Sequence, residues 1–489
     1  MSSQRLLALS TVAAAAAAIL LLQWHRRRHK IKHNKLQLTC KKCATSAAQH
    51  AAALRTHFAA VVGDLKAESL LLALRTPPSL TTVRVNIGRT SVDEARAALS
   101  HSLRTQLQPH PSLDDVLCLH LTGPHTHPLL SKIVAVDRGC AEAVLRGADI
   151  FAPGIRGCSA DLMAGEDVSI VCVDPLVSSR EVHRGEKLRR EAVSGGAGWL
   201  HVGNGRANYG RRDLFPPGQH ASQAAASSSD TAAVSMTARV YDGPSLNGVL
   251  PESLFLQNLP SALAVHLLDP QPGELIVDLC SAPGGKTTHA AALLRHRSKG
   301  IDAGRVIAID RSKARLASVG TLAERLGVAD LIELVHMDAT RVHGDKNAKL
   351  KLRGSVDRVL LDPPCSALGI RPRLALTQTV DELKSCAAYQ KRLLESAVAL
   401  LRPGGTLLYS TCTISVEENE RVIEHALRGQ QVAKLRLVPP PERLRLGGAG
   451  WAGGGLTDAE CSMVQRFDPS TASGEATIGF FVARLERVA

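Results

Sequence analysis

Two cysteines, Cys365 and Cys412, each follow a strand-like run and stand where a thiol could act on a bound substrate. The first closes the string DPPC that begins at Asp362, and the second lies in the string STCT. A thiolate is a strong nucleophile that can add to an electrophilic carbon and form a covalent intermediate. Either cysteine alone would more often be a buried structural residue, but two thiols beside a carboxylate favour covalent catalysis.

Carboxylates close three successive strand-like runs, at Asp278, Asp310 and Asp338. After the first comes the string DLCSAPGGKTT, whose paired Gly284 and Gly285 would let the backbone approach a ligand where a helix begins. Asp310 is expected to accept hydrogen bonds from ribose hydroxyls. The chain lacks a GxxxxGK[ST] loop, so a pyrophosphate site is disfavoured. A cationic sulfonium cofactor such as S-adenosylmethionine fits an acid-lined pocket better.

The elements that would position these side chains alternate between strand-like and helical patterns from about Tyr241 onward. The strand-like runs are 275–279, 306–309, 331–335, 359–361 and 406–409. This alternation predicts an α/β fold with a Rossmann-like, doubly wound parallel sheet. Because ligands bind at the carboxyl ends of strands in such sheets, the acids and both thiols should face one crevice.

The residues before this region show other patterns. Residues 44–75 have helical periodicity, residues 81–86 read as a strand, and 91–103 read as a helix with Ser91 as its N-cap and Glu94 at the capping-box position. From 130 to about 240, short apolar runs such as 133–136 and 168–173 alternate with Gly and Pro, which is typical of a small β-rich domain. Residues 222–233 are Ala- and Ser-rich and read as a surface loop.

Length and composition limit the number of domains and the kinds of protein that the chain can be. A chain of 489 residues with 45% hydrophobic residues is expected to fold into two or three domains. Aromatic residues make up only 3%, which argues against base stacking as the main contact with nucleic acid. Most of the net charge of +14 comes from residues 1–60, so the body of the chain is only mildly basic. Eleven irregularly spaced cysteines indicate a reducing compartment. The lone CxxC pair, Cys40 and Cys43, lacks a second pair of ligands that would complete a zinc site, so we predict no metal.

The N-terminal extension, residues 1–60, is apolar and then basic. Residues 6–22 are apolar apart from Ser10 and Thr11, and the basic string HRRRHK follows at 25–30. A membrane anchor would place the basic flank and the catalytic body in the cytosol. A mitochondrial presequence would explain the acid-free stretch, and an extension of no defined role is the third reading. We expect a cytoplasmic protein, with membrane anchoring through 6–22 or a mitochondrial location as the alternatives.

Three strings in the second half carry a family resemblance. DLCSAPGGKTT (278–288), DPPCSALGIRPR (362–373) and YSTCTISVEENE (409–420) resemble motifs of the Nop/Sun (NOL/NOP/Sun-domain) family of RNA 5-methylcytosine methyltransferases. The resemblance covers about residues 245–485 and implies an S-adenosylmethionine-dependent methyltransferase sheet. Pro363 and Ser281 each stand where the family usually has Ala, and both are mild departures from its pattern.

The resemblance implies a role for each matching residue. Cys412 would be the nucleophile that adds to carbon-6 of cytosine, and Cys365 would assist product release. Negative charge that builds on the ring needs a proton or donor near the ring nitrogen, for which Asp362 is placed, and Lys286 would orient the base or offset charge. The implied cofactor contacts are Cys280, Ser281, Ala282, Pro283, Gly284, Gly285, Lys286, Asp310, Asp338 and Asp362.

Three further strings, at 145–155, 255–274 and 465–481, resemble the branch of this family that sets a PUA domain before the catalytic domain. The implied domains are 61–129, the N-terminal part of the methyltransferase module, 130–240, the PUA domain, and 241–489, the catalytic domain. We expect the protein to be a monomer. The implied partner is tRNA, bound at its 3′ CCA end and acceptor stem. Ribosomal RNA is the alternative substrate, and a catalytically idle RNA-binding scaffold is the alternative from another class.

Overall fold

The computed structural model groups residues 45–489 into one compact unit, which is the unit considered below. The residues that it describes are 46–103, 106–194, 198–216, 231–246, 248–342, 352–429, 432–471 and 477–488. Among these residues, no helix is long and apolar enough to cross a bilayer. The predicted anchor at 6–22 and the CxxC pair Cys40 and Cys43 lie outside the described residues, so those expectations stay predictions.

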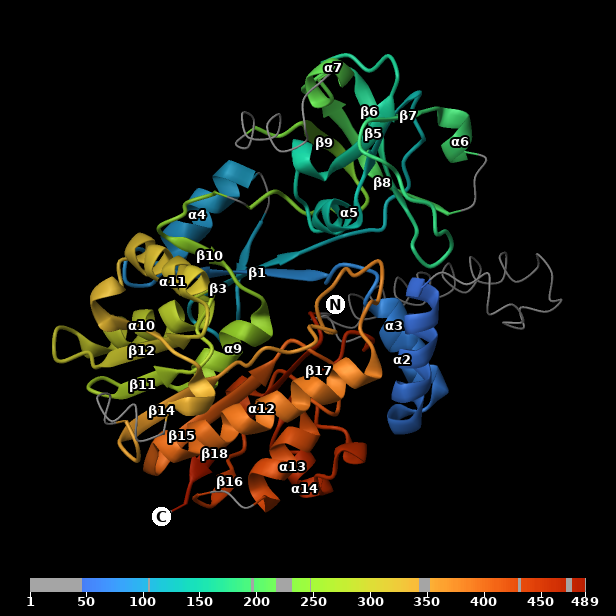
Figure 1. Cartoon of the computed structure of the whole chain (residues 1–489). Coiled ribbons are helices and arrows are strands. Elements are labelled where there is room, and N and C mark those ends of the chain that lie inside the picture. Colours follow the sequence, from blue (N-terminus) through green and yellow to red (C-terminus); the bar gives the residue numbers. More distant parts are fainter. Residues whose placement is uncertain are drawn as a thin grey trace, which may run out of the picture. The chain divides into compact units, whose positions relative to one another are not determined.

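The largest sheet has eight strands and follows the predicted α/β pattern (Figure 1). Its order is β13-β12-β11-β14-β15-β18-β16, and β17 pairs with β18. The first five strands in this order are parallel, and β18 is antiparallel to β15. The strands are β11 (Leu275–Asp278), β12 (Arg305–Asp310), β13 (Ile332–His336), β14 (Val356–Leu361), β15 (Leu401–Thr411), β16 (Leu435–Leu437), β17 (Gln465–Phe467) and β18 (Phe480–Arg487). The five predicted parallel strands are therefore confirmed.

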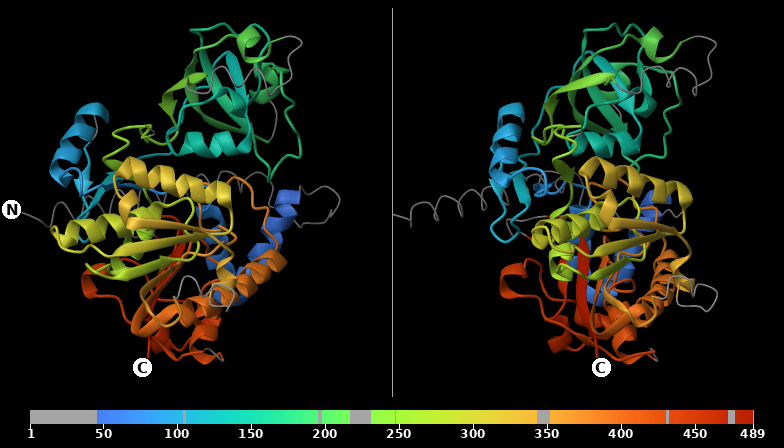
Figure 2. Two further views of the ribbon diagram at one scale, coloured as in Figure 1. Left: turned by 60° about the vertical axis from the view of Figure 1, so that its left-hand side comes forward. Right: turned by 90° about the vertical axis from the view of Figure 1, so that its left-hand side faces the viewer.

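Helices cover both faces of this sheet, as Figures 1 and 2 show. Successive strand residues point to opposite faces, so Ile276 and Leu360 belong to one core cluster and Val277 and Leu361 to another. The first cluster includes residues of α9 (Leu259–Leu268), α10 (Gly285–Ser298) and α11 (Lys313–Leu326), and the second includes residues of α12 (Val380–Leu400) and α13 (Glu420–Arg428). The inner strands β11, β12, β14 and β15 are buried on both faces, which explains their nearly continuous apolar runs.

A second sheet joins chain segments that are far apart in the sequence. Its order is β10-β1-β3-β2, and its strands are β1 (Leu80–Val85), β2 (Gln108–Pro109), β3 (Val116–His120) and β10 (Leu254–Leu256). Val83 of β1 pairs with Leu256 of β10, although the two are separated by a complete third sheet along the chain. The strand predicted at 81–86 is confirmed, and α4 (Val92–Leu103) confirms the predicted helix. Ser91 and Glu94 form the predicted capping box.

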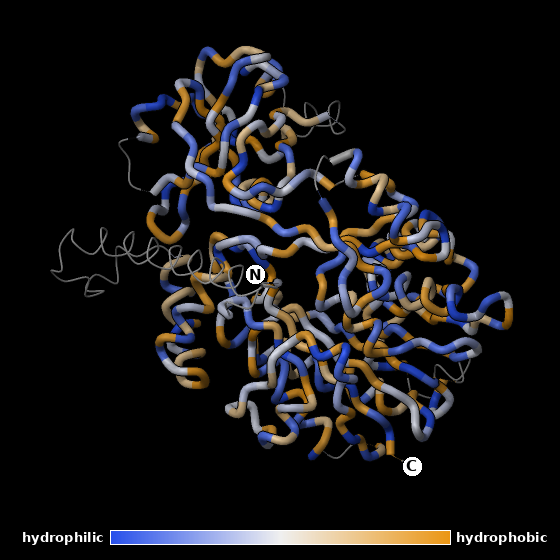
Figure 3. The backbone as a smooth tube through the Cα atoms, turned by 180° about the vertical axis from the view of Figure 1, so that it is seen from behind, coloured by the Kyte–Doolittle hydropathy of each residue, from blue (hydrophilic) through white to orange (hydrophobic). Residues whose placement is uncertain are grey.

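The third sheet holds six strands in the order β7-β5-β4-β6-β8-β9. Its elements are β4 (Lys132–Val136), α5 (Arg138–Leu145), β5 (Ile155–Ser159), β6 (Asp167–Val173), β7 (Glu186–Leu188), α6 (Arg190–Ser194), β8 (Trp199–Ala207), α7 (Arg211–Leu214) and β9 (Val234–Arg239). It has its own apolar core, in which Val134, Ile170 and Val202 are buried. Hydrophilic and hydrophobic residues alternate over short stretches of the chain, as expected for elements with one buried face (Figure 3). The expected β-rich domain is thus present. Most of the predicted loop at 222–233 lies outside the described residues.

Two N-terminal helices pack beside the catalytic strands. The segment predicted as helical at 44–75 forms α2 (Ser46–Val62) and α3 (Asp64–Ala73), which are separated by Gly63 with φ +82°. Leu54 and Phe58 of α2 share a core cluster with Ile414, two residues after Cys412. The His57 imidazole lies 3.0 Å from the Glu417 carboxylate. These helices therefore support the loop that follows β15.

Candidate active site

The two predicted thiols meet at the carboxyl edge of the large sheet. Cys365 lies on the loop after β14, and Cys412 directly follows β15, its parallel neighbour in the sheet. Their Sγ atoms are 3.4 Å apart, within hydrogen-bond distance for sulfur. The expectation that both sulfurs face one crevice is confirmed by this distance.

The contact between the thiols makes their pKa values diverge. A hydrogen bond from Cys365 lowers the pKa of Cys412; burial opposes this shift, and the nearby Lys286 ammonium supports it. The same hydrogen bond, together with burial, holds the pKa of Cys365 well above its usual range. The arrangement favours one thiolate at Cys412 and one thiol at Cys365, which is the distribution that a nucleophile and a proton donor require.

An ion pair lies beside the thiols. The Lys286 Nζ, at the start of α10, donates to the Asp362 Oδ2 at 2.7 Å, and the Ser410 hydroxyl donates to the Asp362 Oδ1 at 2.8 Å. The Asp362 side chain is 32% exposed, whereas that of Lys286 is 12% exposed. Asp362 is therefore fixed by two donors and keeps a face open to a ligand.

Two cavities adjoin these residues. The first, of about 220 Å³, is lined by Cys280, Ala282, Asp310, Asp362, Cys365 and Cys412 among others. The second, of about 230 Å³, is lined by Asp278, Cys280, Ser281, Ala282, Pro283, Gly285, Lys286 and Asp362 among others. Cys280, Ala282 and Asp362 border both cavities. The structure thus gathers nearly all of the predicted site residues around adjoining spaces.

Two buried carboxylates accept hydrogen bonds from the segment between β11 and α10 and from the start of α10. Asp278 accepts from the Thr287 hydroxyl at 2.7 Å, and burial raises the pKa of Asp278 to about 7. Asp310, at the end of β12, accepts from the backbone N–H of Ala282 at 3.3 Å. Gly284 has φ +105°, and a Cβ there would lie 3.2 Å from the Val319 Cα. Glycine is therefore required where the loop passes α11 and enters α10.

One predicted cofactor residue is placed differently from the others. Asp338 follows β13, but its carboxylate accepts from the Thr340 backbone N–H and hydroxyl at 3.0 and 2.8 Å. Its neighbour Ala339, not Asp338, lines the first cavity. The acid caps a short helical turn, Ala339–Arg341, which is the local role that any acid at such a position can take.

Several cavity residues were not predicted. Arg311, Arg315 and Tyr389 line the first cavity, and Arg315 donates to the Ala282 carbonyl at 2.6 Å. Phe255, Gln257 and Asn258 line the second. The two arginines follow the end of β12 within five residues, and closeness to the end of a parallel strand could have predicted them as site residues. Tyr389 lies in the middle of α12, where the sequence carries no signal that would predict a place in the site.

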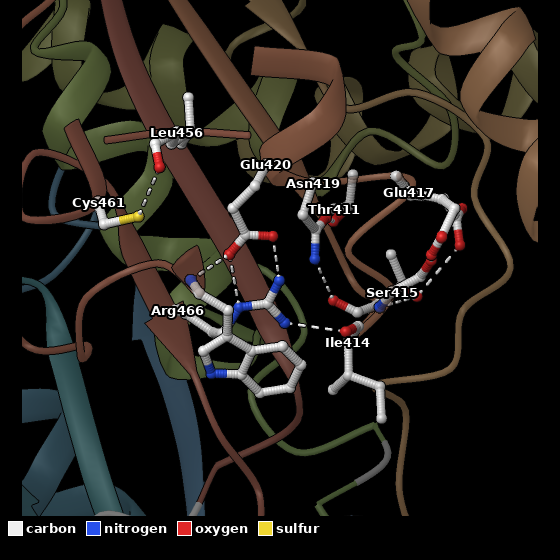
Figure 4. A network of polar contacts seen from close by, with 12 residues as sticks. Thr411, Ile414, Ser415, Glu417, Asn419, Glu420, Leu456, Cys461 and Arg466 are labelled. Carbon is white, nitrogen blue, oxygen red and sulfur yellow. Dashed lines mark hydrogen bonds and ion pairs between the residues drawn. The ribbon is translucent and has the colours of Figure 1, made fainter. Parts of the chain in front are cut away.

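Figure 4 shows a buried ion pair behind the Cys412 loop. The Arg466 guanidinium pairs with both oxygens of Glu420, and the two side chains are 1% and 0% exposed. Arg466 also donates to the Ile414 carbonyl at 2.9 Å, and its Cζ lies 3.8 Å from the centre of the Trp451 ring. These contacts fix the backbone two residues after the nucleophile.

Asn419 holds the same loop from another side (Figure 4). Its amide nitrogen donates to the Thr413 carbonyl at 3.0 Å, and its amide oxygen accepts from the Thr411 hydroxyl at 2.5 Å. The residues on either side of Cys412 are therefore bound to one buried side chain. Such fixation reduces the reorganisation that the nucleophile needs before it attacks.

Three residues outside the two cavities have the spacing of metal ligands. The donor atoms of Asp115, His266 and His289 lie within 4.8 Å of one another. Each imidazole Nε2 is 2.7 Å from a different oxygen of Asp115, and burial lowers the pKa of His289 to about 4. Both rings hydrogen-bond this carboxylate, so the group serves as a buried brace between α9, α10 and the turn before β3.

Two family models match this chain, one over the large sheet and one over part of the third sheet. Residues 265–486 match the family model described as 16S rRNA methyltransferase RsmB/F, and residues 132–175 match that of the PUA domain. Mouse tRNA (cytosine(72)-C(5))-methyltransferase NSUN6 is 38% identical over 421 residues, which cover 83% of this chain and 82% of that protein. The chain belongs to the RsmB/F (Nop/Sun) family of RNA cytosine-C5 methyltransferases.

The chain is also similar to a relative named for ribosomal RNA and to a solved structure. The rRNA (cytosine-C(5))-methyltransferase NOP2C of Arabidopsis thaliana is 32% identical over 541 aligned residues, covering 84% of this chain and 86% of that protein. The crystal structure of NSun6 from Pyrococcus horikoshii with SFG superposes with a TM-score of 0.71 at 29% identity, covering 89% of this chain and 98% of that one. SFG is an analogue of S-adenosylmethionine.

The residues of this RsmB/F member fit the cofactor of its family, which depends on S-adenosylmethionine. The first cavity lies at the carboxyl ends of β11, β12 and β14, where a doubly wound sheet binds its ligand. Among the described residues, none hydrogen-bonds the buried Ser281 hydroxyl, which leaves it available to a polar ligand atom. Asp310 contributes a carboxylate at a strand end bordering the cavity.

Proposed function

We propose that this protein transfers a methyl group to carbon-5 of a cytosine near the 3′ acceptor end of tRNA, with Cys412 as the nucleophile. The single observation that carries the proposal is the 3.4 Å contact between the Cys365 and Cys412 sulfurs at a cavity that Asp362 also lines. An enzyme that methylates an exocyclic amino group needs no thiol at either position.

The proposed reaction begins with addition of the Cys412 thiolate to carbon-6, which makes carbon-5 nucleophilic. Lys286 and Asp362 form an ion pair at the same edge, and we assign them to holding the base and balancing charge at its ring nitrogen. After the methyl group is transferred to carbon-5, water accepts the carbon-5 proton, the electrons of that C–H bond re-form the ring double bond, and the bond between Cys412 and carbon-6 breaks. The Cys412 sulfur leaves as a thiolate, which the hydrogen bond from Cys365 stabilises.

S-adenosylmethionine, the cofactor of the family, supplies an electrophilic methyl group. We assign its binding to Cys280–Lys286, Asp310 and Asp362, which border the two cavities, and to Asp338 beside them. Tyr389 and Arg311 also line the first cavity. The target base must leave its stack to reach Cys412, which favours a strand end or loop of the RNA.

The substrate assignment rests on the relatives. Mouse NSUN6 is named for cytosine 72 of tRNA, and its alignment covers 83% of this chain, which is more than the catalytic match at 265–486 alone. We therefore assign 61–129 and 241–489 to the methyltransferase module and 130–240 to a PUA domain that binds the tRNA 3′ end. Ribosomal RNA is the second candidate, because NOP2C, named for rRNA, is 32% identical.

The test is methylation of defined RNAs by the purified full chain with labelled S-adenosylmethionine. Full-length tRNA transcripts, the same transcripts lacking the 3′ CCA, and a ribosomal RNA fragment are compared, and the product is mapped by bisulfite sequencing. We expect 5-methylcytosine in the acceptor stem of intact tRNA and at least a tenfold lower rate without the CCA. Preferential methylation of the ribosomal fragment would replace the tRNA assignment by the second candidate.

A further inference from the structure

A buried carboxylate, Glu418, lies between the two loops that carry the cysteines. Its Oε2 accepts from the Ser366 backbone N–H at 2.8 Å, and its Oε1 accepts from the Ser366 hydroxyl at 2.5 Å. The same Oε1 accepts from the Thr413 hydroxyl at 3.2 Å. Ser366 directly follows Cys365, and Thr413 directly follows Cys412. One carboxylate thus binds the residue next to each thiol.

The carboxylate is also anchored to α12. Gln390 donates to the Glu418 Oε2 at 3.1 Å and to the Pro364 carbonyl at 3.0 Å, so it holds both the carboxylate and the Cys365 loop. Tyr409 donates to the Glu418 carbonyl at 2.6 Å. Glu418 is 0% exposed, and none of the ion pairs among the described residues includes it. Its charge is therefore balanced by neutral donors alone, an expensive arrangement for a group without a function.

We propose that Glu418 is a positioning residue, which fixes the separation of the two sulfurs and keeps the shared proton on Cys365 so that Cys412 is the thiolate. The inference rests on the proposed roles of the two cysteines. It deepens them, because it explains how two similar thiols, on adjacent strand ends, come to have different protonation states.

Electrostatics supports the geometric argument. The hydrogen bond that Cys365 donates to Cys412 and burial raise the pKa of Cys365, and the negative charge of Glu418 adds to this shift. On the other side, Lys286 favours the thiolate at Cys412 and Asp362 opposes it. At Cys412 the charges of Asp362 and Lys286 oppose each other, whereas Glu418 acts on Cys365 without a paired cation, and this asymmetry creates a gradient along the pair.

The remaining groups that face the pair do not remove this gradient. Arg373 interacts with both sulfurs and so favours neither strongly. Tyr409 and Cys386, which lie near Glu418, have raised pKa values because they are buried, so both stay neutral near pH 7.5. Burial raises the pKa of Glu418 as well, while the hydrogen bonds from Ser366, among others, oppose that shift and favour its ionised form.

The test measures where a thiol reagent reacts, in the full chain without RNA or cofactor. Wild type and Glu418→Gln are treated with limiting iodoacetamide at pH 7.5, and the labels on Cys412 and Cys365 are quantified by peptide mass spectrometry. We expect Cys412 to dominate in wild type, and the ratio of Cys412 to Cys365 label to fall by about tenfold in Glu418→Gln, the change that one pKa unit represents. An unchanged ratio in the folded variant would overturn the proposal.

The matched control is Glu417→Gln, which alters the adjacent buried carboxylate. Glu417 is 3% exposed, but its partners are His57, Arg421 and Ser415, not the residues next to the thiols (Figure 4). We expect the labelling ratio of this control to stay within about twofold of wild type. A fall as large as that of Glu418→Gln would mean that any buried charge near the loop has this effect, and the proposal would fail.

A second variant covers the case in which Glu418→Gln does not fold. Ser366→Ala keeps the carboxylate and removes only one of its donors, so the fold should be preserved. We expect the labelling ratio to fall by about threefold, and an unchanged ratio would refute the positioning role. Because no RNA or cofactor is present, a failure here leaves the proposed methylation untouched, and a failure of methylation leaves the labelling result valid.

Discussion

Replacement of Cys365 by alanine should raise the pKa of Cys412, because the hydrogen bond from Cys365 is the largest contribution that lowers it. The two sulfurs are 3.4 Å apart and both cysteines are half-buried, so we expect water to replace the lost donor only in part. A hydrogen bond to an ionised group contributes about 1.5–3 kcal/mol. Since one pKa unit corresponds to about 1.4 kcal/mol, the expected rise is about 1–2 units.

The assay is the pH dependence of iodoacetamide alkylation at Cys412, measured without RNA between pH 5 and 10. The thiolate is the reactive form, so the rate profile of Cys365→Ala should move to higher pH, and its rate near pH 7 should fall about 10- to 100-fold. Cys140→Ala, which removes a buried thiol of α5, is the control and should leave the profile in place. A profile that is unchanged, or moved to lower pH, would refute the assignment of the Cys365 proton.

Three other changes probe separate parts of the site. Lys286→Met removes the cation paired with Asp362 and should slow single-turnover methyl transfer, measured at saturating cofactor, by about 10²- to 10³-fold. Asp310→Asn should weaken cofactor binding by about tenfold in a calorimetric titration, and tRNA binding should not change. Arg466→Met leaves Glu420 buried without its partner and should lower the free energy of unfolding in urea by about 3–5 kcal/mol; a loss below about 1 kcal/mol would contradict the importance of this pair.

The sequence could predict the part of the site that strand ends determine. Asp278, Asp310 and Cys412 each end or directly follow a strand of the parallel sheet, and parallel strands bring their carboxyl ends to one edge. That rule was sufficient to place the two thiols together, although 47 residues separate them. Asp338 also follows a strand, but its carboxylate accepts from the Thr340 backbone N–H beside the first cavity, so its part in cofactor binding stays a proposal.

The sequence could not predict contacts that depend on how distant elements pack. Three acids occur within four residues at Glu417, Glu418 and Glu420, and their spacing does not tell which one faces the thiol loops. The answer depends on Gln390, which a different helix contributes. The pairing of β1 with β10 was equally hidden, because a whole six-stranded sheet intervenes along the chain. In both cases the partner is set by tertiary packing rather than by local periodicity.

The most direct test of the account is to trap the covalent bond between Cys412 and its RNA. Cys365→Ala, incubated with tRNA and S-adenosylmethionine, should accumulate a denaturant-resistant protein–RNA complex, since the thiol assigned to release is absent. Mass spectrometry of the digested complex should locate the nucleotide on Cys412, and the complex should not form when Cys412→Ala is added to the same variant. A complex that persists without the Cys412 sulfur would contradict the central claim.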